Sequence, residues 1–235
     1  KVYFGKDEEQ KIGRILAEYH PSKVLIHFGS GSARRSGLLD RVEAFLTEEG
    51  ISFTELGGVV ANPALSMVRE GIALAQKEGV DFVLAVGGGS VLDSAKAIAN
   101  GIANPEADVW DFFQGKAVPV RTLPKGAILT LAAAGSEMSA SCVISNTETG
   151  EKRGFNSAFN RMNFAIENPA LTYTVSPYQT ACGAVDIAMH TIERDFCPGT
   201  DTYLTDAIAE AVIKSVRKAS ADCLKNPEDY AARGN

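Results

Sequence analysis

The segment 81–103, DFVLAVGGGSVLDSAKAIANGIA, constrains the fold more than any other part of the sequence. Its first six residues are almost all apolar and show no helical stripe, which is typical of a strand buried on both faces. Gly87, Gly88 and Gly89 follow, and then Ser90 begins a run with apolar or small residues at helical spacing. The pattern predicts a buried strand, a glycine turn and the start of a helix.

The glycine turn has two interpretations. Glycines let a backbone approach a phosphate closely, and the free N–H groups and dipole at a helix start favour an anion. Gly87, Gly88, Gly89 and Ser90 are therefore candidates for holding the pyrophosphate of a dinucleotide. The alternative is a tight turn with Ser90 as the N-cap and Asp93 as its capping-box partner.

Strand and helix patterns alternate along the first part of the chain, and alternation of this kind predicts βαβ units and a parallel sheet with helices on both faces. Strands are expected at 2–4, 23–28, 51–56, 81–86, 127–131 and 163–166, an antiparallel excursion at 141–145 and 154–155, and helices at 7–19, 38–49, 64–77 and 108–113. Near residue 175 the pattern becomes helical, with long helices expected at 177–196 and 202–224 around Pro198 and Gly199. The fold class is therefore α/β, followed by the start of an all-helical domain.

The composition excludes several classes of protein. The hydrophobic fraction of 45% and the charged fraction of 22% are ordinary for a globular protein, and a net charge of −6 argues against nucleic-acid binding. The sequence contains neither a long apolar run nor a signal peptide, so no membrane association is expected. Four scattered cysteines without a C-x-x-C pair suggest a reducing cytoplasm. The absence of an initial Met suggests a fragment.

The loop after the expected strand 23–28 bears on the choice of nucleotide. It contains no acidic residue that could hold a ribose 2′-hydroxyl. Instead it contains four small residues, Gly29–Ser32, and then Arg34 and Arg35. Small hydroxyls, free backbone and arginines can bind a 2′-phosphate. We therefore expect NADP(H) to bind more tightly than NAD(H), and the alternative is a solvated loop with two surface arginines.

Asp186 and His190 are four residues apart, so on a helix they share a face. They could contribute to a divalent metal site or form an i,i+4 ion pair. Two ligands do not complete a metal site, and neither His20 nor His27 is an obvious third ligand.

Four motifs occur together and in order: GGGSVLDSAKAIA, LTLAAAGSEMSA, NTETGEK and GAVDIAMHTIE. In this the chain resembles the iron-containing (group III) alcohol dehydrogenases, in particular their NADPH-dependent butanol dehydrogenases and broad-range aldehyde reductases. The resemblance implies a Rossmann-like dinucleotide-binding domain over 1–174 and a partial helical metal-binding domain over 175–235.

The resemblance also implies roles for individual residues. Gly87–Ser90 would hold the pyrophosphate, and Asp93 would lie near the nicotinamide end. Asp186 and His190 would be two metal ligands, with Fe²⁺ expected and Zn²⁺ or Ni²⁺ as alternatives. The remaining positions that match cofactor contacts are Ser32 at the 2′-phosphate, Asn62 near the adenosine, and Thr130, Ser139 and Lys152.

The implied activity is hydride transfer between NADP(H) and a small aldehyde or primary alcohol, with the metal as a Lewis acid. A homodimer is expected, joined through the edge strand 2–4. The family has two further histidine ligands beyond the point where this chain ends. One alternative is therefore a non-catalytic NADP(H)-binding fragment, and another is a relative similar to a glycerol dehydrogenase.

Overall fold

The computed structural model describes residues 1–196 and 202–235, so Cys197 and the expected Pro198-Gly199 break lie outside the described residues. The chain divides into two compact units. The first, which we call the α/β unit, comprises Lys1–Thr130 and Gly135–Glu167. The second, which we call the helical unit, comprises Leu131–Ala134 and Asn168–Asn235.

A six-stranded parallel sheet in the order β1-β8-β5-β4-β2-β3 organises the α/β unit. Its strands are β1 (Val2–Phe4), β2 (Val24–Gly29), β3 (Phe53–Val59), β4 (Phe82–Gly87), β5 (Lys125–Leu129) and β8 (Phe164–Glu167). Strand β4 lies between β2 and β5, where Val86 pairs with Phe28 and with Ile128. All the pairings in this sheet are parallel, which confirms the predicted α/β fold class.

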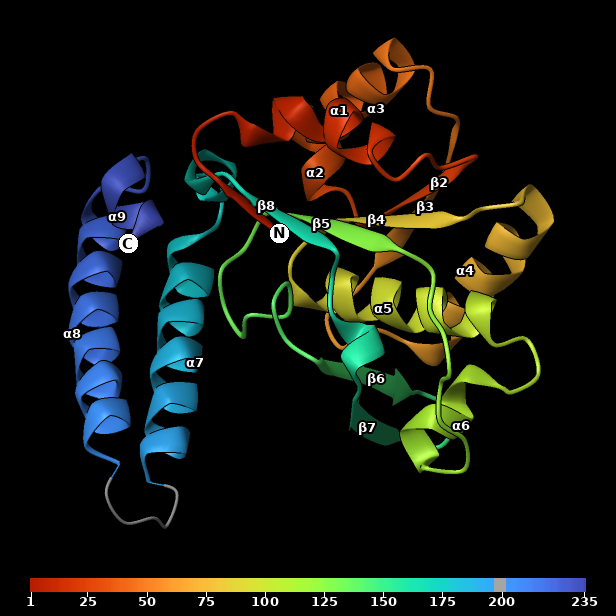
Figure 1. Cartoon of the computed structure of the whole chain (residues 1–235). Coiled ribbons are helices and arrows are strands. Elements are labelled where there is room, and N and C mark those ends of the chain that lie inside the picture. Colours follow the sequence, from red (N-terminus) through yellow and green to blue (C-terminus); the bar gives the residue numbers. More distant parts are fainter. Residues whose placement is uncertain (197–201) are drawn as a thin grey trace. The chain divides into compact units, whose positions relative to one another are not determined.

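Helices cover both faces of the sheet, as the βαβ pattern predicts (Figure 1). One face carries α1, α2 and α3, and the other carries α4 and α5 (Figure 1). The bounds are η1 (Glu8–Lys11), α1 (Ile12–Ala17), α2 (Ser32–Arg35), α3 (Leu38–Glu48), α4 (Leu65–Glu78), α5 (Gly89–Ala103), α6 (Val109–Gln114) and η2 (Ala158–Asn160). The short helix α2 lies in what the sequence suggests is a loop. It is bracketed by Gly31 and Gly37, whose positive φ values of 138° and 71° let the chain enter and leave it.

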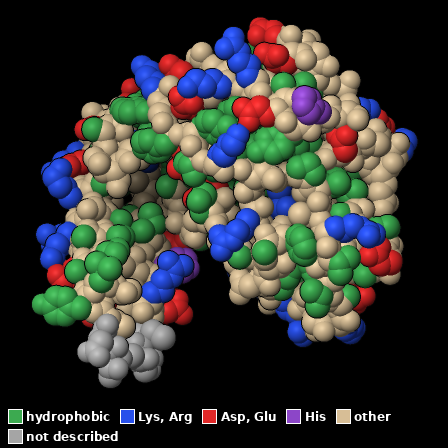
Figure 2. Space-filling view, in the orientation of Figure 1, with side chains coloured by type: hydrophobic (Ala, Val, Ile, Leu, Met, Phe, Trp, Pro, Cys, Tyr) green, Lys and Arg blue, Asp and Glu red, His purple; other side chains and the backbone are tan. Residues whose placement is uncertain are grey.

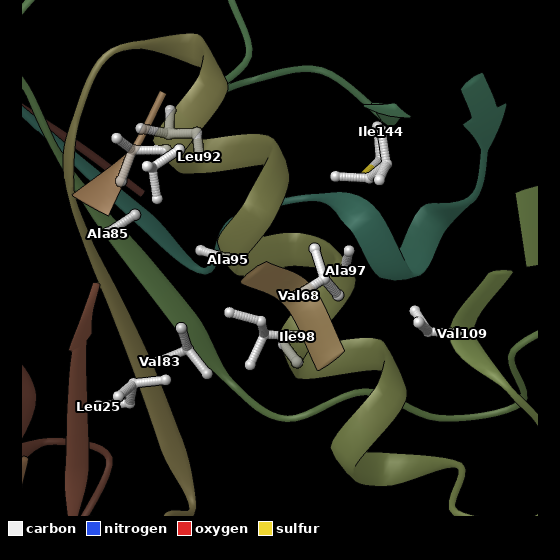
Figure 3. Packing of buried hydrophobic residues seen from close by; sticks show 14 of the residues in the cluster. Leu25, Val68, Val83, Ala85, Leu92, Ala95, Ala97, Ile98, Val109 and Ile144 are labelled. Atoms are coloured by element: carbon white, nitrogen blue, oxygen red, sulfur yellow. The ribbon is translucent and has the colours of Figure 1, made fainter. Parts of the chain in front are cut away.

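The core lies between β4 and the inner face of α5. Every residue of β4 is buried, and Leu92, Ala95 and Ile98 of α5 lie at helical spacing facing the strands (Figure 3). Gly71 of α4 faces Ile98 so closely that a Cβ there would come within 2.4 Å of the Ile98 Cδ1 atom. This packing fixes the start of α5 at the carboxyl end of β4.

A two-stranded antiparallel hairpin, β6 (Ser141–Asn146) and β7 (Glu151–Asn156), confirms the predicted excursion. Its turn contains Gly150, whose φ is 72°. The hairpin is joined to the loop after β3, because the Ser145 N–H donates to the Pro63 carbonyl at 2.9 Å. The hairpin therefore lies beside a loop that contains one of the candidate cofactor residues.

The helical unit contains η3 (Pro169–Thr172), α7 (Pro177–Asp195), α8 (Tyr203–Lys225) and α9 (Tyr230–Gly234). Ser176 caps α7 by accepting a hydrogen bond from the Gln179 N–H at 3.2 Å, and Pro177 follows it, which is a favoured start. A Cβ on Gly183 would lie 2.6 Å from the Ala132 carbonyl oxygen, so glycine permits the close approach of segment 131–134 to α7.

Hydrophobic side chains are visible on the surface of α7 and α8 (Figure 2), and Tyr203 is 90% exposed. Within the described residues, no helix combines the length and the hydropathy needed to cross a bilayer.

Candidate functional site

Four loops of the α/β unit lie along the carboxyl edge of the sheet. Parallel strands present their carboxyl ends at the same edge, and open α/β sheets bind ligands there. The order of the strands places the loop after β3 at one end, then the loops after β2, β4 and β5. These loops contain the predicted cofactor residues Asn62, Ser32, Gly87–Ser90, Thr130 and Ser139.

The glycine turn joins β4 directly to α5. The N-cap of this 15-residue helix is Gly88, and no side chain caps it, so the first N–H groups of α5 have no intrahelical acceptor. Gly87 is needed for packing, because a Cβ there would lie 2.6 Å from the Val91 Cγ2 atom. Thr130 lies beside the turn, where its N–H donates to the Gly87 carbonyl at 3.1 Å.

The capping-box alternative for this turn is wrong. Gly88 is the N-cap and Ser90 is already inside the helix. The Asp93 carboxylate does not accept a hydrogen bond from the Ser90 N–H. It accepts from the Ser136 hydroxyl at 2.6 Å and from the Val143 N–H at 3.0 Å. Asp93 therefore joins α5 to the segment that follows β5 and to β6.

Lys96 is a buried residue of this region that the sequence interpretation missed. Its side chain is completely buried, and Nζ lies 3.3 Å from the Asp93 Oδ1 atom, 2.8 Å from the Ser136 Oγ atom and 3.5 Å from the Ser139 Oγ atom. A signal was available, because Lys96 follows Asp93 at i+3, the spacing of a helical ion pair, in a helix that is rich in apolar residues. The cluster contains two of the predicted cofactor residues, Asp93 and Ser139.

Asn62 and Lys152 form a second pair of predicted cofactor residues. The Lys152 ammonium donates to the Asn62 Oδ1 atom at 2.8 Å, although the two residues are 90 positions apart. Both side chains are exposed, and Asn62 has a φ of 57°, a conformation that asparagine tolerates better than most residues. The structure therefore brings the loop after β3 and the hairpin together at this edge.

The two arginines after β2 differ from each other in their environment. Arg34 is bound by carboxylates, with Asp40 at 2.8 Å, Glu43 at 2.5 Å and Glu55 closer still. The sequence suggested that Arg34 could pair with a phosphate, but its guanidinium is already neutralised. Arg35 is exposed, lies 2.8 Å from where a Gly31 Cβ would be, and has no ion pair among the described residues.

Burial raises the pKa of Glu55, and the neighbouring Glu43 raises it further. The sequence could not show this acidic cluster, because Asp40 and Glu43 come from α3 and Glu55 comes from β3.

His27 is a structural residue inside the sheet. Its Nδ1 lies 2.9 Å from the Leu56 carbonyl oxygen and its Nε2 lies 2.8 Å from the Ser94 Oγ atom. Nδ1 must therefore carry the proton, because a carbonyl only accepts, and Nε2 accepts from Ser94. Burial lowers the pKa of His27 to about 4. Both ring nitrogens of His27 therefore have hydrogen-bond partners inside the fold.

Asp186 and His190 lie on one face of α7, as their spacing predicts. The Asp186 Oδ1 and His190 Nδ1 atoms are 3.7 Å apart, and both side chains are about half exposed. A carboxylate oxygen and an imidazole nitrogen suit Fe²⁺ or Zn²⁺ as part of a ligand set. No group of three or more possible metal ligands occurs among residues 1–196 and 202–235.

The parallel sheet, its glycine turn and the helices on both faces define a Rossmann-like α/β protein, to which the helical unit is joined. A family model described as iron-containing alcohol dehydrogenase matches residues 1–169. The chain belongs to this family.

Similar proteins agree with that assignment. NADH-dependent butanol dehydrogenase A of Clostridium acetobutylicum is 42% identical over all of this chain and 60% of its own length. NADPH-dependent aldehyde reductase YqhD of Escherichia coli is 39% identical over the same shares. The crystal structure of NADH-dependent butanol dehydrogenase A from Thermotoga maritima superposes with a TM-score of 0.96 at 40% identity, over all of this chain and 58% of that one. The chain thus spans about 60% of the length of these curated relatives.

Proposed function

We propose that the whole protein transfers hydride between NADP(H) and a small aldehyde or primary alcohol. Membership of the iron-containing alcohol dehydrogenase family supports oxidoreduction of this kind. The similarity to proteins named butanol dehydrogenase and aldehyde reductase supports the substrate class. In this proposal residues 1–174 bind the dinucleotide and residues 175–235 are part of a metal-binding domain.

The dinucleotide proposal depends mainly on the presence of a glycine at position 89. In a helix interior glycine costs about 1 kcal/mol of stability relative to alanine. Gly89 is the first residue of α5, where the greater backbone freedom of glycine still favours alanine, so a glycine there needs a reason. The fold supplies none at this position: the φ of Gly89 is not in the left-handed region, and a Cβ would meet only the Ser136 Cβ atom, at 3.9 Å. We infer that this position lacks a side chain so that the backbone N–H groups of the first turn of α5 can hold a phosphate.

The order of the loops along the carboxyl edge of the sheet indicates which loops would bind the adenosine half of the dinucleotide and which would bind the nicotinamide half. Ser32 after β2 and Asn62 after β3 would lie at the adenosine half, and Gly87–Ser90 after β4 at the pyrophosphate. Thr130 after β5, together with Asp93 and Ser139, would lie at the nicotinamide half, and Lys152 would reach the cofactor from the hairpin. We assign the 2′-phosphate of NADP(H) to Ser32 and Arg35, because Arg35 has no carboxylate partner in the part of the chain that the structure describes.

The metal proposal rests on Asp186 and His190. Their oxygen and nitrogen donors would hold one divalent ion, with Fe²⁺ expected and Zn²⁺ or Ni²⁺ possible by the same chemistry, and the whole protein would supply the remaining ligands. Such an ion supplies Lewis-acid stabilisation of a substrate oxygen. What these two residues contribute is a fixed pair of donors one helical turn apart.

The dinucleotide proposal is tested by the substitution Gly89→Ala. We expect unchanged or slightly higher stability of the free protein, because alanine favours the helix, and NADPH affinity lower by at least tenfold, because the methyl group occupies the phosphate position. Gly87→Ala is the contrasting variant, since its methyl group would collide with Val91 and lower stability itself. Fluorescence titration with NADPH and NADH gives the affinities. Unchanged NADPH affinity in Gly89→Ala would remove the glycine turn from the site.

The metal proposal is tested by Asp186→Ala, with His20→Ala as a control at an exposed histidine. We expect Asp186→Ala to lower the bound Fe²⁺ or Zn²⁺ and the rate of NADPH oxidation with butyraldehyde, and to retain NADPH binding. Turnover equal to that of the unmodified protein would exclude a role for Asp186 in the reaction.

A second candidate function is NADP(H) binding without catalysis. Metal analysis together with the butyraldehyde assay separates the two functions, because binding without metal and without turnover supports this one.

The proposal extends to a homodimer. Strand β1 lies at the edge of the sheet, and its Val2 and Phe4 side chains are 45% and 57% exposed. An exposed edge strand can pair with a second copy of the chain. Light scattering of the protein and of a Phe4→Pro variant, which removes an outward-facing backbone donor from β1, would test this pairing.

A further inference from the structure

Lys96 is a charged residue placed where the fold alone would favour an apolar one. It lies on α5 among buried residues, and its side chain has no exposed surface. A buried ammonium group is tolerated only when it is paired and hydrogen-bonded. Besides Asp93 and Ser136, Nζ donates to the Ser141 carbonyl at 2.8 Å. Lys96 therefore fastens one turn of α5 to the segment between β5 and β6.

Hydrogen bonds within the protein occupy most, but not all, of the acceptor positions of the Asp93 carboxylate. It accepts from Lys96, from the Ser136 hydroxyl and from the Val143 N–H. Two carboxylate oxygens offer about four acceptor positions, so one remains. The Asp93 side chain is 16% exposed, whereas that of Lys96 is fully buried. Asp93 can thus accept one further hydrogen bond from outside, while Lys96 cannot reach a ligand.

The position of Asp93 indicates which half of a dinucleotide it would meet. It lies one turn after the glycine turn, and its partners Ser136 and Val143 follow β5 in the chain. Strand β5 is on the opposite side of β4 from β2. A cofactor whose adenosine half lies over β2 would therefore present its nicotinamide half to Asp93.

We propose that Lys96 is a positioning residue of the nicotinamide subsite. It never touches the cofactor; it holds the Asp93 carboxylate so that its one open acceptor position meets a donor on the nicotinamide half, namely a ribose hydroxyl or the carboxamide NH₂. Ser136 completes the link, because its hydroxyl accepts from Lys96 and donates to Asp93. This inference rests on the proposed dinucleotide function.

The chain provides a matched control in Lys125. This lysine is also fully buried, but it donates to the Thr122 Oγ1 atom at 2.9 Å and to the Leu123 carbonyl at 3.4 Å. It begins β5, at the opposite end of the strand from Thr130. Lys125→Met therefore removes a buried ammonium from the same unit without touching Asp93.

The test compares two ligands in Lys96→Met and Lys125→Met. NADPH contains the nicotinamide half, and adenosine 2′,5′-bisphosphate lacks all of it, both the ring and its ribose. The dissociation constant of the bisphosphate divided by that of NADPH therefore measures what the nicotinamide half contributes to binding. We expect this ratio to fall about tenfold or more in Lys96→Met, as loss of a hydrogen bond to a charged group predicts, with adenosine 2′,5′-bisphosphate affinity within about twofold of the unmodified protein. The ratio in Lys125→Met is expected to stay unchanged.

Ser136→Ala is the second variant, in case Lys96→Met does not fold. It removes the hydroxyl between Lys96 and Asp93 and keeps both charges, and we expect the same ratio to fall about three- to tenfold. A ratio equal to that of the unmodified protein in either folded variant would overturn the positioning role, as would an equal fall in Lys125→Met. Failure of the unmodified protein to bind NADPH or NADH would instead overturn the proposed function itself, and this inference with it.

Discussion

The burial of His27 predicts a specific dependence of stability on pH. In the folded protein the pKa of His27 is lowered to about 4 by burial, whereas an unfolded chain restores the ordinary value of 6.5. Between these values the unfolded state binds more protons than the folded state, so stability rises with pH in this window. The contribution is fully present above pH 6.5 and is lost as the pH falls toward 4. This lowering of the His27 pKa corresponds to about 3 kcal/mol in the free energy of unfolding.

The fluorescence of Trp110 can be used to follow unfolding. Trp110 is the single tryptophan of the chain and is 5% exposed in α6, so its fluorescence reports unfolding of the α/β unit, which contains His27. Urea unfolding at pH 7, 5.5 and 4.5 would give the free energy of unfolding at each pH. We expect a loss of about 1.4 kcal/mol for each pH unit below 6.5 from this residue.

A His27→Gln variant isolates the contribution of this residue. Glutamine does not titrate, so its free energy of unfolding should fall less between pH 7 and 4.5 than that of the unmodified protein, even though the variant is less stable at pH 7. His20→Gln, at an exposed histidine, should keep the original dependence. If His27→Gln shows the same loss between pH 7 and 4.5 as the unmodified protein, the assignment of a neutral, buried imidazole is refuted.

Two further predictions concern packing and charge. Gly13→Ala should lower the free energy of unfolding by about 1–3 kcal/mol, measured with urea, because a Cβ would lie 2.4 Å from the Phe45 carbonyl oxygen; a loss below 0.5 kcal/mol would contradict this contact. Arg34→Gln should cost about 1 kcal/mol or less of stability, since its ion pairs are partly exposed, and should leave the ratio of NADPH to NADH affinity unchanged. Arg35→Gln should lower that ratio about tenfold without loss of stability, and an effect in Arg34→Gln alone would reverse the two assignments.

The order of strands and helices could be predicted from sequence because the signals were local and strong. The all-apolar run before Gly87 identified β4, and the alternation around it gave a parallel sheet, which the strand pairings confirm. The helix α2 was missed because a helix of four residues is too short to show a periodic pattern. The helix α9 was missed for the same reason, at five residues.

The candidate site could be predicted only in part. Spacing placed Asp186 and His190 on one helix face, and the structure brings them to 3.7 Å. The capping-box alternative failed because Asp93 found partners in Ser136 and Val143, which are more than 40 positions away. The engagement of Arg34 was hidden for the same physical reason: its carboxylates come from different elements, and no local pattern encodes tertiary pairing.

A crystal structure of the protein grown with NADPH would test the central claim most directly. The account predicts the diphosphate of NADPH against the backbone N–H groups at the start of α5, with the adenosine half toward Ser32 and the nicotinamide half toward Asp93. Density for the dinucleotide at any other place, or a diphosphate held by side chains away from Gly87–Ser90, would contradict it.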